Sequence, residues 1–473
     1  MPRQSLLMAR LVVDGTQVPG GTLTRHLDDV TAALEECGVG PGTAVCTTAR
    51  TGVPLVVTMM AADRLGAVAV LGEGPPGSAG VPRSVRAKVG ADARGVPVVE
   101  PVAAFAGLPP DPALPPEGGA VFWTSGSGGT PKAVLLSRTA LDYQAEASWE
   151  RFEATADDHW LVPLPLAHAY GFSILHMWRR FGPALHVLST LRPAAVADRL
   201  IDPRITLLDG VPGLYGLLLR LAERDPVLRT RLAGLRLRGC GGDVLPGELA
   251  GRFAAVVGQP IHDGYGLTEA GPNVAVSGPG TYRPGTVGTA LRGTELRTDP
   301  ATGEVLVRGP GLMTGYLGDP ESTASILPAD GWLRTGDRGE LLPGGFLRIT
   351  GRLKDVIIVQ GETFAPSTVE DVLYGVAGVA EAAAVGVPHG SPRGDLVMAY
   401  VVPQDRGTGR LTGGITDRAA RDGLAAALEA RCRACLPPVL RPRRIELVPE
   451  LPTLSSGKLD RAALRYRGQE RHV

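Results

Sequence analysis

Lysine is nearly absent from this sequence. Lysine and arginine together number 48 among 473 residues, yet lysine stands only at positions 88, 132, 354 and 458. Since arginine supplies the positive charge elsewhere, a retained lysine indicates a task that suits a compact, mobile ammonium better than a rigid guanidinium fork. Three of these four lysines fall in the motifs described below.

Cysteine is also scarce. The five cysteines are odd in number and scattered, so a disulfide framework is not expected. Cys432 and Cys435 form a C-x-x-C pair, but a metal site needs a second pair or nearby histidines, and none is present. Two cysteines on one helix is therefore the favoured interpretation.

Net charge and long apolar runs are lacking as well. A formal net charge of zero and a pI near 7.1 give no general attraction to nucleic acid or to an anionic membrane. The best apolar stretch, residues 52–71, is interrupted by Asp63 and Arg64 and is too short on either side to span a bilayer. Arg3 and Arg10 flank too few apolar residues for a secretory signal. We expect a cytoplasmic monomer or homodimer with no nucleic-acid or membrane partner.

Helix-like and strand-like segments alternate from residue 22 to about residue 350. This alternation predicts an α/β fold whose parallel sheets carry helices on both faces. The predicted elements are a helix with Leu23, Leu27, Val30 and Leu34 on one face, strands at Ala44–Thr47 and Ala67–Leu71, a loop at Gly74–Pro82, a helix at Leu214–Leu221 and a strand at Leu235–Arg238.

A second, smaller unit begins near Lys354. Its predicted elements are a strand at Val356–Val359, a helix at Pro366–Tyr374, a strand at Ala382–Val387, a helix at Arg418–Arg433 and a polar tail after Leu464. The sequence thus predicts an N-terminal domain of helix-flanked β-sheets, residues 1–352, and a small α+β C-terminal domain, residues 353–473.

A glycine- and hydroxyl-rich loop, TSGSGGTPK at residues 124–132, follows a predicted strand at Ala120–Trp123. Glycines let backbone N–H groups turn toward a phosphate, hydroxyls add donors and a lysine adds charge. It is not a Walker loop, because Lys132 follows a proline and no helix N-terminus with Ser or Thr comes next. Taken alone, the loop could equally be a flexible turn.

Four further motifs follow in order: GYGLTE at 264–269, TGD at 335–337, GRLKD at 351–355 and SSGK at 455–458. With the first loop, this set resembles the adenylate-forming superfamily, which includes acyl- and aryl-CoA synthetases, the adenylation domains of peptide synthetases and firefly luciferase. The resemblance covers residues 120–466 and implies a mobile C-terminal domain. The first 120 residues match only in general pattern and are shorter than is usual in the family.

The resemblance assigns the first loop to the β- and γ-phosphates of ATP. The residues implied are Thr124, Ser125, Gly126, Ser127, Gly128, Gly129, Thr130 and Lys132. A hydroxyl residue normally stands where this chain has Gly128. Because the backbone donors remain, we expect weaker ATP binding rather than inactivity.

The resemblance also implies how the rest of the nucleotide is bound. Tyr265 would stack on adenine, Thr268 would hydrogen-bond the α-phosphate, and Glu269 would hold a Mg²⁺ ion that bridges phosphate oxygens. Asp337 would accept both ribose hydroxyls, with Arg352 beside it. The glycines implied at this site are Gly241, Gly242 and Gly266.

Lys458 is implied as the lysine of the adenylation step. Attack of a carboxylate on the α-phosphate brings two anions together, and an ammonium reaching both offsets the repulsion and stabilises the developing charge. The small domain must therefore close over the large one. Lys354 matches the family's hinge position, about which the small domain would then rotate, and the backbone near Gly361 would line the channel for pantetheine.

The segment PLPLAHAYG at residues 163–171 matches the part of the family that lines the acyl pocket. Amino-acid-activating members carry an aspartate where this chain has Ala167 and His168, which favours an aryl, alicyclic or fatty acid. His168 and Tyr170 could present flat faces to such a group; alternatively, His168 plugs the pocket while the acid is absent. The pocket residues implied are His168, Ala169, Tyr170, Gly171 and Gly264, and His168 joins Lys458, Thr268 and Glu269 as a catalytic candidate.

Two carboxylates, Asp209 and Asp243, stand near expected pocket positions. Either could bind a substrate hydroxyl or amine, and solvent-facing roles are equally open.

The resulting hypothesis is an acid–thiol ligase that uses ATP and Mg²⁺ to convert a small carboxylic acid into acyl-AMP and then a thioester of coenzyme A. An alternative acceptor is the phosphopantetheine of a separate acyl carrier protein. A luciferase-like oxygenase would need a luciferin pocket for which the sequence has no sign. A nucleotide-binding relic is disfavoured because Lys132, Glu269, Asp337, Arg352 and Lys458 are all retained.

Overall fold

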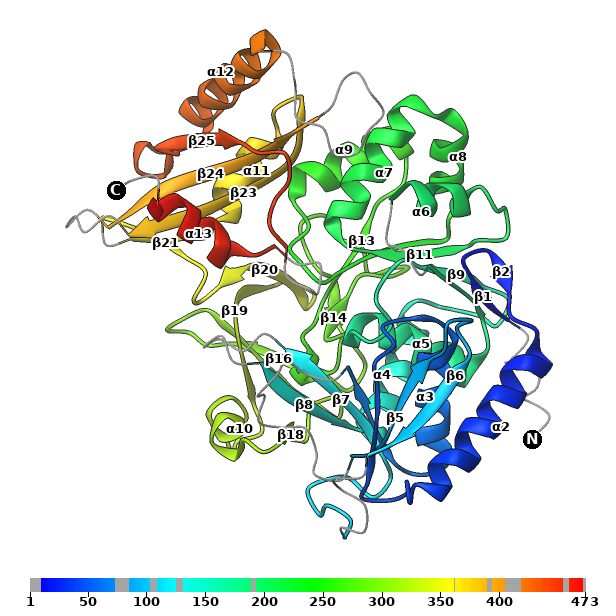
Figure 1. Cartoon of the computed structure of the whole chain (residues 1–473). Coiled ribbons are helices and arrows are strands. Elements are labelled where there is room, and N and C mark those ends of the chain that lie inside the picture. Colours follow the sequence, from blue (N-terminus) through cyan, green and yellow to red (C-terminus); the bar gives the residue numbers. More distant parts are fainter. Residues whose placement is uncertain are drawn as a thin grey trace.

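The computed structural model describes residues 10–72, 85–102, 109–124, 131–188, 193–360, 362–388, 394–404, 418–453 and 459–470. Most of the chain forms a large body of two β-sheets and their helices, and the C-terminal elements form a smaller body against it (Figure 1). The predicted loop at Gly74–Pro82 lies outside the described residues.

The first sheet has seven strands in the order β18-β8-β7-β4-β3-β5-β6. Its central strands are parallel, whereas β6, β8 and β18 run antiparallel to their neighbours. The strands are β3 (Ala44–Thr47), β4 (Val68–Leu71), β5 (Val85–Ala91), β6 (Pro97–Pro101), β7 (Gly119–Thr124), β8 (Lys132–Ser137) and β18 (Gly315–Tyr316). Because β7 pairs with β8, the two ends of the predicted phosphate loop, Thr124 and Lys132, lie opposite each other.

The second sheet has thirteen strands in the order β16-β17-β19-β20-β15-β14-β13-β12-β11-β9-β10-β1-β2. They are β1 (Leu11–Val13), β2 (Thr16–Gln17), β9 (His159–Val162), β10 (Ala184–Val187), β11 (Leu207–Gly210), β12 (Leu237–Cys240), β13 (His262–Tyr265), β14 (Ala275–Val276), β15 (Thr289–Ala290), β16 (Glu295–Thr298), β17 (Glu304–Arg308), β19 (Leu333–Leu342) and β20 (Phe346–Arg352). Strands β1 and β9 to β13 are parallel, and the strands from β14 to β20 are antiparallel.

The prediction of parallel sheets up to residue 350 is therefore wrong for the last part of this sheet. A parallel pair needs a crossover of a dozen or more residues, usually a helix. Strands β19 and β20 are joined by a tight turn in which Gly344 and Gly345 adopt φ of +86° and +76°, so only an antiparallel hairpin can form.

Helices cover both faces of the parallel half of the second sheet. Along β9, Trp160 and Val162 belong to the core shared with α4 and α5, while Leu161 belongs to the core shared with the helices α6 to α9. This alternation follows from the two-residue period of a strand. The helices of the large body are α2 (Gly20–Glu36), α3 (Gly52–Arg64), α4 (Arg138–Arg151), α5 (Ala169–Phe181), α6 (Pro193–Leu200), α7 (Pro212–Arg224), α8 (Pro226–Gly234), α9 (Gly247–Val257), the short 3₁₀ helix η2 (Thr268–Ala270) and α10 (Pro320–Ile326).

The predicted helical face in the N-terminal region is confirmed, because Leu23, Leu27, Val30 and Leu34 are the buried residues of α2. Among the described residues, none of the helices combines the length and the apolar content that crossing a bilayer requires.

The smaller body contains the strand order β23-β24-β25 and a separate hairpin of β21 and β22. Its elements are β21 (Ile357–Val359), β22 (Glu362–Phe364), α11 (Ser367–Tyr374), β23 (Val379–Pro388), β24 (Asp395–Pro403), α12 (Arg418–Cys435), η3 (Pro438–Leu440), β25 (Arg444–Leu447) and α13 (Arg461–Glu470). All five cysteines are free, and Cys432 and Cys435 lie on α12 as predicted.

The predicted polar tail after Leu464 is instead the helix α13. Leu464 and Gly468, four residues apart, are buried on one face of this helix, and Tyr400 of β24 donates a hydrogen bond to the carbonyl of Leu464. Arg465, also on α13, pairs with Asp355 at 3.3 Å. With only two buried positions, the helix has too weak an apolar pattern to be read from its sequence.

Candidate active site

A pocket of about 830 Å³, partly open to solvent, lies at the carboxyl ends of the parallel strands β11, β12 and β13, next to the start of α5. Ligands of open α/β sheets bind at this end of the strands. Ten of the residues implied by the family resemblance line the pocket: His168, Ala169, Tyr170, Gly171, Asp209, Gly241, Gly242, Gly264, Gly266 and Thr268.

The turn into α5 sets one wall of the pocket. His168 occupies the N-cap position, and its backbone N–H donates to the carbonyl of Pro165 at 3.1 Å. A Cβ atom at Gly171 would lie 2.4 Å from that same carbonyl oxygen, so only glycine allows the helix to approach this closely. His168 and Tyr170 are thereby held at the pocket lining.

Asp209 is buried at this wall, with 2% of its surface exposed. One carboxylate oxygen accepts a hydrogen bond from the Tyr170 hydroxyl at 2.5 Å, and the other accepts from Trp160 Nε1 at 2.6 Å. Burial raises the pKa of Asp209, although these two hydrogen bonds act in the opposite direction. The solvent-facing role left open for Asp209 is wrong, because the side chain anchors the Tyr170 ring.

The neighbouring strand β12 leaves room for the carboxylate of Asp209. Gly239 stands opposite Asp209 in the pairing of β11 and β12, and a Cβ atom there would lie 2.3 Å from Asp209 Oδ1. A side chain on β12 at this position would displace the carboxylate and the Tyr170 ring that it holds.

Asp243 does not belong to this pocket. Its side chain is exposed, its Oδ1 accepts from the backbone N–H of Val244 at 2.8 Å, and it is not among the lining residues. Its charge acts instead on Arg352 and Arg461, at the boundary with the smaller body. Its position after Gly241 and Gly242 correctly predicted that Asp243 lies in the loop beside the pocket. It did not predict that the side chain points away from the pocket.

His262 also lines the pocket, and the sequence reasoning missed it. It is 9% exposed, and among the described residues its Nδ1 has no hydrogen-bond partner. Burial lowers its pKa to about 4, so the ring is neutral at physiological pH. The available signal was its position two residues before Gly264 on β13, which places both residues on the same face of the strand.

Three residues implied for adenine and ribose form one hydrogen-bonded group, called the ribose clamp here: Tyr265, Asp337 and Arg352. The Tyr265 hydroxyl donates to Asp337 Oδ2 at 2.8 Å, and Arg352 Nε lies 2.9 Å from Asp337 Oδ1. Asp337 of β19 stands directly opposite Arg352 of β20, so strand register brings the pair together. Each carboxylate oxygen keeps further acceptor capacity, which a pair of ribose hydroxyls could use.

A second group surrounds Glu269 on η2. The hydroxyl of Tyr316 donates to Glu269 Oε1 at 2.9 Å, and Lys132 Nζ lies 4.5 Å from the centroid of the Tyr316 ring. Burial, followed by the charge of Glu269, raises the pKa of Tyr316, so the phenol stays protonated and acts as a donor. The sequence reasoning named Glu269 and Lys132 but missed Tyr316, which is 47 residues from Glu269.

Several implied residues lie outside the described residues: Ser125, Gly126, Ser127, Gly128, Gly129, Thr130, Gly361 and Lys458. At the edges of the phosphate loop, Thr124 Oγ1 lies 3.5 Å from the carbonyl oxygen of Lys132. Lys354 is exposed and lies between β20 and β21, at the passage from the large body to the small one.

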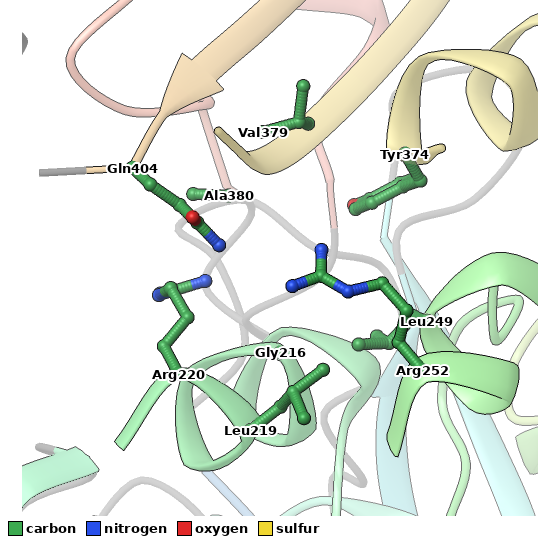
Figure 2. A pocket seen from close by; sticks show the side chains of 9 residues that line it. All are labelled: Gly216, Leu219, Arg220, Leu249, Arg252, Tyr374, Val379, Ala380 and Gln404. Atoms are coloured by element: carbon green, nitrogen blue, oxygen red, sulfur yellow. The ribbon is translucent and has the colours of Figure 1, made fainter. Parts of the chain in front are cut away.

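The smaller body packs against α7 and α9 of the large body. Asp371 of α11 accepts a hydrogen bond from the backbone N–H of Gly247, the first residue of α9. Neighbouring side chains enclose a gap of about 280 Å³, into which Arg220, Arg252 and Gln404 point (Figure 2). The two bodies are thus in direct contact.

Segments on either side of position 458 lie at this boundary. Thr453 and Leu459 pair across the segment, and Arg461 forms an ion pair with Glu370. Burial lowers the pKa of Arg461, but the charges of Glu370 and Asp243 outweigh it and raise the pKa. Because the charge of Asp243 acts on Arg461, the start of α13 lies near the loop that follows β12.

Comparison with known proteins identifies the family. A family model described as AMP-binding enzyme matches residues 78–317, and one described as AMP-binding enzyme C-terminal domain matches residues 368–458. The chain is 33% identical to a feruloyl-CoA synthase of Amycolatopsis sp over 360 residues, which is 73% of this chain and 69% of the relative. It is 30% identical to a long-chain-fatty-acid–CoA ligase of Bacillus subtilis (strain 168) over 364 residues, 74% of this chain and 62% of the relative.

Solved structures match over nearly the whole chain. The amide bond synthetase McbA from Marinactinospora thermotolerans matches with a TM-score of 0.77 and 26% identity over 98% of both chains. The anthranilate CoA ligase AuaEII matches with a TM-score of 0.78 and 21% identity over 97% of this chain and 94% of the other. The chain belongs to the AMP-binding enzyme family, which confirms the resemblance to adenylate-forming enzymes and the α/β fold class with a smaller C-terminal domain.

Proposed function

We propose that this protein is an AMP-forming acyl-CoA synthetase that activates a non-amino-acid carboxylic acid with ATP and then forms its CoA thioester. The observation that carries the proposal is the continuity of β13 and η2. This short segment contributes Gly264 to the acyl pocket, Tyr265 to the ribose clamp, and Thr268 and Glu269 to the position proposed for the phosphates. An acid in the pocket would therefore lie beside the α-phosphate of the nucleotide.

The pocket favours an acid with a flat, largely apolar body. Gly241, Gly242, Gly264 and Gly266 leave one side without side chains, and the aromatic rings of Tyr170 and Phe152 border it. Asp209 is the one carboxylate among the described lining residues, and each of its oxygens already accepts a hydrogen bond from Tyr170 or Trp160, which makes it a poorer partner for an α-ammonium group. We propose an aryl or alicyclic acid ahead of a fatty acid, in line with the relative named feruloyl-CoA synthase.

Glu269 fits a Mg²⁺ ion carried in with ATP. Magnesium prefers oxygen ligands and is commonly held by one or two carboxylates together with substrate phosphates and water. Oε1 of Glu269 is engaged by Tyr316, and the second oxygen is available to a metal. Among the described residues, no group of three or more acidic, histidine or cysteine side chains could hold a metal alone, which matches an ion that depends on phosphate for its other ligands. When bound, the ion would neutralise phosphate charge.

Lys458 is proposed to reach the carboxylate and the α-phosphate during adenylation, where an ammonium offsets the repulsion between two anions. The position of Arg461 near Asp243 supports an approach of this segment to the large body. After adenylation, rotation about Lys354 would withdraw Lys458 and bring the hairpin around Gly361 to the pocket. We place the domain boundary between residues 352 and 353, where β20 ends.

Two other molecules could accept the acyl group from the adenylate. A carrier-protein thiol would use the same adenylate, and an amine would give an amide, a possibility favoured by the full-length likeness to an amide bond synthetase. The proposed cytoplasmic location and monomeric or homodimeric state stay predictions.

Mass spectrometry after incubation with ATP, Mg²⁺ and a panel of aryl, alicyclic, fatty and amino acids tests the proposal. With CoA present, we expect an acyl-CoA, AMP and pyrophosphate for at least one non-amino acid. Adenylate that persists with CoA but disappears with a carrier protein or an amine would move the assignment to that acceptor. No adenylate from any acid would contradict the proposal.

A further inference from the structure

Tyr316 lies between two residues of the proposed ATP site that come from different parts of the chain. Its hydroxyl donates to Glu269 Oε1 at 2.9 Å, and the face of its ring lies 4.5 Å from Lys132 Nζ. Its side chain is 9% exposed and packs in the largest hydrophobic core. A single, well-anchored ring therefore touches both the carboxylate and the ammonium.

Hydrogen bonds of the backbone hold the segment that carries Tyr316 in place. Tyr316 on β18 pairs with Val134 on β8, the strand that begins with Lys132. Three residues earlier, the N–H of Met313 donates to the carbonyl of Glu269 at 2.9 Å, which ties the same segment to η2. The N–H of Tyr316 donates to Oγ1 of Thr323 in α10 at 2.8 Å. The chain before and after Tyr316 thus holds β8 and η2 in a fixed relation.

We propose that Tyr316 is a positioning residue that sets both the metal-binding carboxylate of Glu269 and the phosphate-binding ammonium of Lys132. The inference rests on the proposed function, because it takes the roles of Glu269 and Lys132 from there. Outer partners that hydrogen-bond a ligating carboxylate orient it toward the metal, and this is the role of the Tyr316 hydroxyl. With Oε1 accepting from Tyr316, Oε2 would be the oxygen left for the metal.

The ring serves the second residue in a different way. Among the described residues Lys132 forms no ion pair, although its charge reaches Asp319 at longer range. A cation held over an aromatic face is attracted by the ring quadrupole without being neutralised. The Tyr316 ring therefore restricts the direction of the Lys132 ammonium without pairing it with an anion, so the ammonium remains available to a phosphate.

The two contacts can be separated by substitution. Tyr316→Phe keeps the ring beneath Lys132 and removes only the hydroxyl, whereas Tyr316→Leu removes both contacts. The readout is binding of Mn²⁺ and ATP to the whole protein without any acid, followed by electron paramagnetic resonance of Mn²⁺, with metal-free ATP binding measured separately by calorimetry.

We expect Tyr316→Phe to weaken Mn²⁺–ATP binding about tenfold, the effect typical of losing an outer partner of a metal ligand. Metal-free ATP should bind to this variant within about twofold of the parent, because the ring contact with Lys132 survives. Tyr316→Leu should weaken both. Tyr143→Phe is the matched control: Tyr143 is a partly buried tyrosine whose hydroxyl donates to the carbonyl of Arg292 at 2.6 Å and not to Glu269, and the loss of this hydroxyl should leave both affinities unchanged.

A folded Tyr316→Phe variant that binds Mn²⁺–ATP as tightly as the parent would overturn the inference while leaving the proposed function intact. Circular dichroism melting of each variant establishes folding, and Tyr316→Phe alone decides the outcome if Tyr316→Leu does not fold. A parent protein that binds no metal–ATP would instead remove the proposed function, and the inference with it.

Discussion

The ribose clamp and the acyl pocket both include residues of β13 but differ in how completely their polar groups are paired. In the clamp, Tyr265, Asp337 and Arg352 already satisfy one another before a nucleotide arrives. In the pocket, Asp209 is paired, but His262 keeps a buried nitrogen without a partner among the described residues. A preorganised clamp suits a nucleotide that is the same in every reaction, whereas His262 adds a neutral ring with unused hydrogen-bonding capacity to the lining of the pocket.

The largest expected effect concerns Lys458, which we propose reaches both the carboxylate of the acid and the α-phosphate of the nucleotide. Lys458→Ala should lower the rate of adenylate formation by about 10³-fold, because it removes the charge that stabilises the transition state. Thioester formation from preformed acyl-adenylate should continue, since the lysine is withdrawn by then. The two half-reactions can be timed separately by rapid quench.

Lys458→Arg should also lose most of its adenylation activity, because a guanidinium is a different shape and a less mobile charge. Lys88 on β5, the one lysine outside the motifs, provides the control, and Lys88→Arg should behave as the parent. Equal losses in both half-reactions of Lys458→Ala would speak against the rotation of the small domain.

Breaking the ribose clamp is the next largest perturbation. Asp337→Ala removes the acceptor of Tyr265 and Arg352 and of the ribose, so adenylation should fall about 100-fold through a weaker affinity for ATP. The loss should be the same for every acid, because the clamp does not touch the pocket. Pyrophosphate release across an acid panel measures this, with the exposed Asp330→Ala as control. A change in acid preference would show that the two regions are not separable.

Asp209→Ala should affect some acids more than others, in contrast to the equal loss expected for Asp337→Ala. Without its anchor, the Tyr170 ring moves, and relative activities across the acid panel should change by about tenfold. The variant should also lose about 1–3 kcal/mol of unfolding free energy, since Trp160 Nε1 and the Tyr170 hydroxyl are left without their acceptor.

Asp243→Ala is the natural control for Asp209→Ala, because the two aspartates are equally suggestive in the sequence and the structure separates them. Asp243 is exposed and outside the pocket, so the ranking of acids should not change. If Asp243→Ala changed the order of activities across the acid panel and Asp209→Ala did not, our assignment of Asp209 rather than Asp243 to the pocket would be contradicted.

The smallest expected effect concerns His262. Its pKa of about 4 lies below the ordinary value of 6.5, so the folded protein binds this proton less readily than the unfolded chain. The stability from neutral His262 is therefore present above pH 6.5 and is lost as the pH falls toward 4. His262→Phe should reduce this loss of stability, which unfolding in urea at pH 7 and at pH 5 would measure. His26→Phe on α2 is the control, and an identical pH response of His262→Phe and the parent would contradict the burial argument.

Site residues that lie in short sequence motifs could be predicted, whereas residues that reach the site through contacts between distant segments could not. Tyr265, Asp337 and Arg352 each sit in a short ordered motif, so their identity and order were enough to name them. Tyr316 and His262 were missed because no local pattern reports a contact between β18 and η2, or marks one lining residue of a strand as unpaired.

The same reasoning accounts for the errors in the fold. The helix over Leu23 to Leu34 has a strong apolar period and was predicted correctly. The helix α13 has two buried positions and was read as a tail, and the two-residue strands β14 and β15 are too short to show alternation. Their structure is imposed by the neighbours that they pair with.

The central claim is that a carboxylate in the pocket attacks the α-phosphate of ATP held by the clamp. An accepted acid labelled with oxygen-18 in its carboxylate, incubated with the protein, ATP, Mg²⁺ and CoA, tests this directly by mass spectrometry of the products. The account predicts one labelled oxygen in AMP and none in pyrophosphate. Label in inorganic phosphate, with ADP as the nucleotide product, would contradict it.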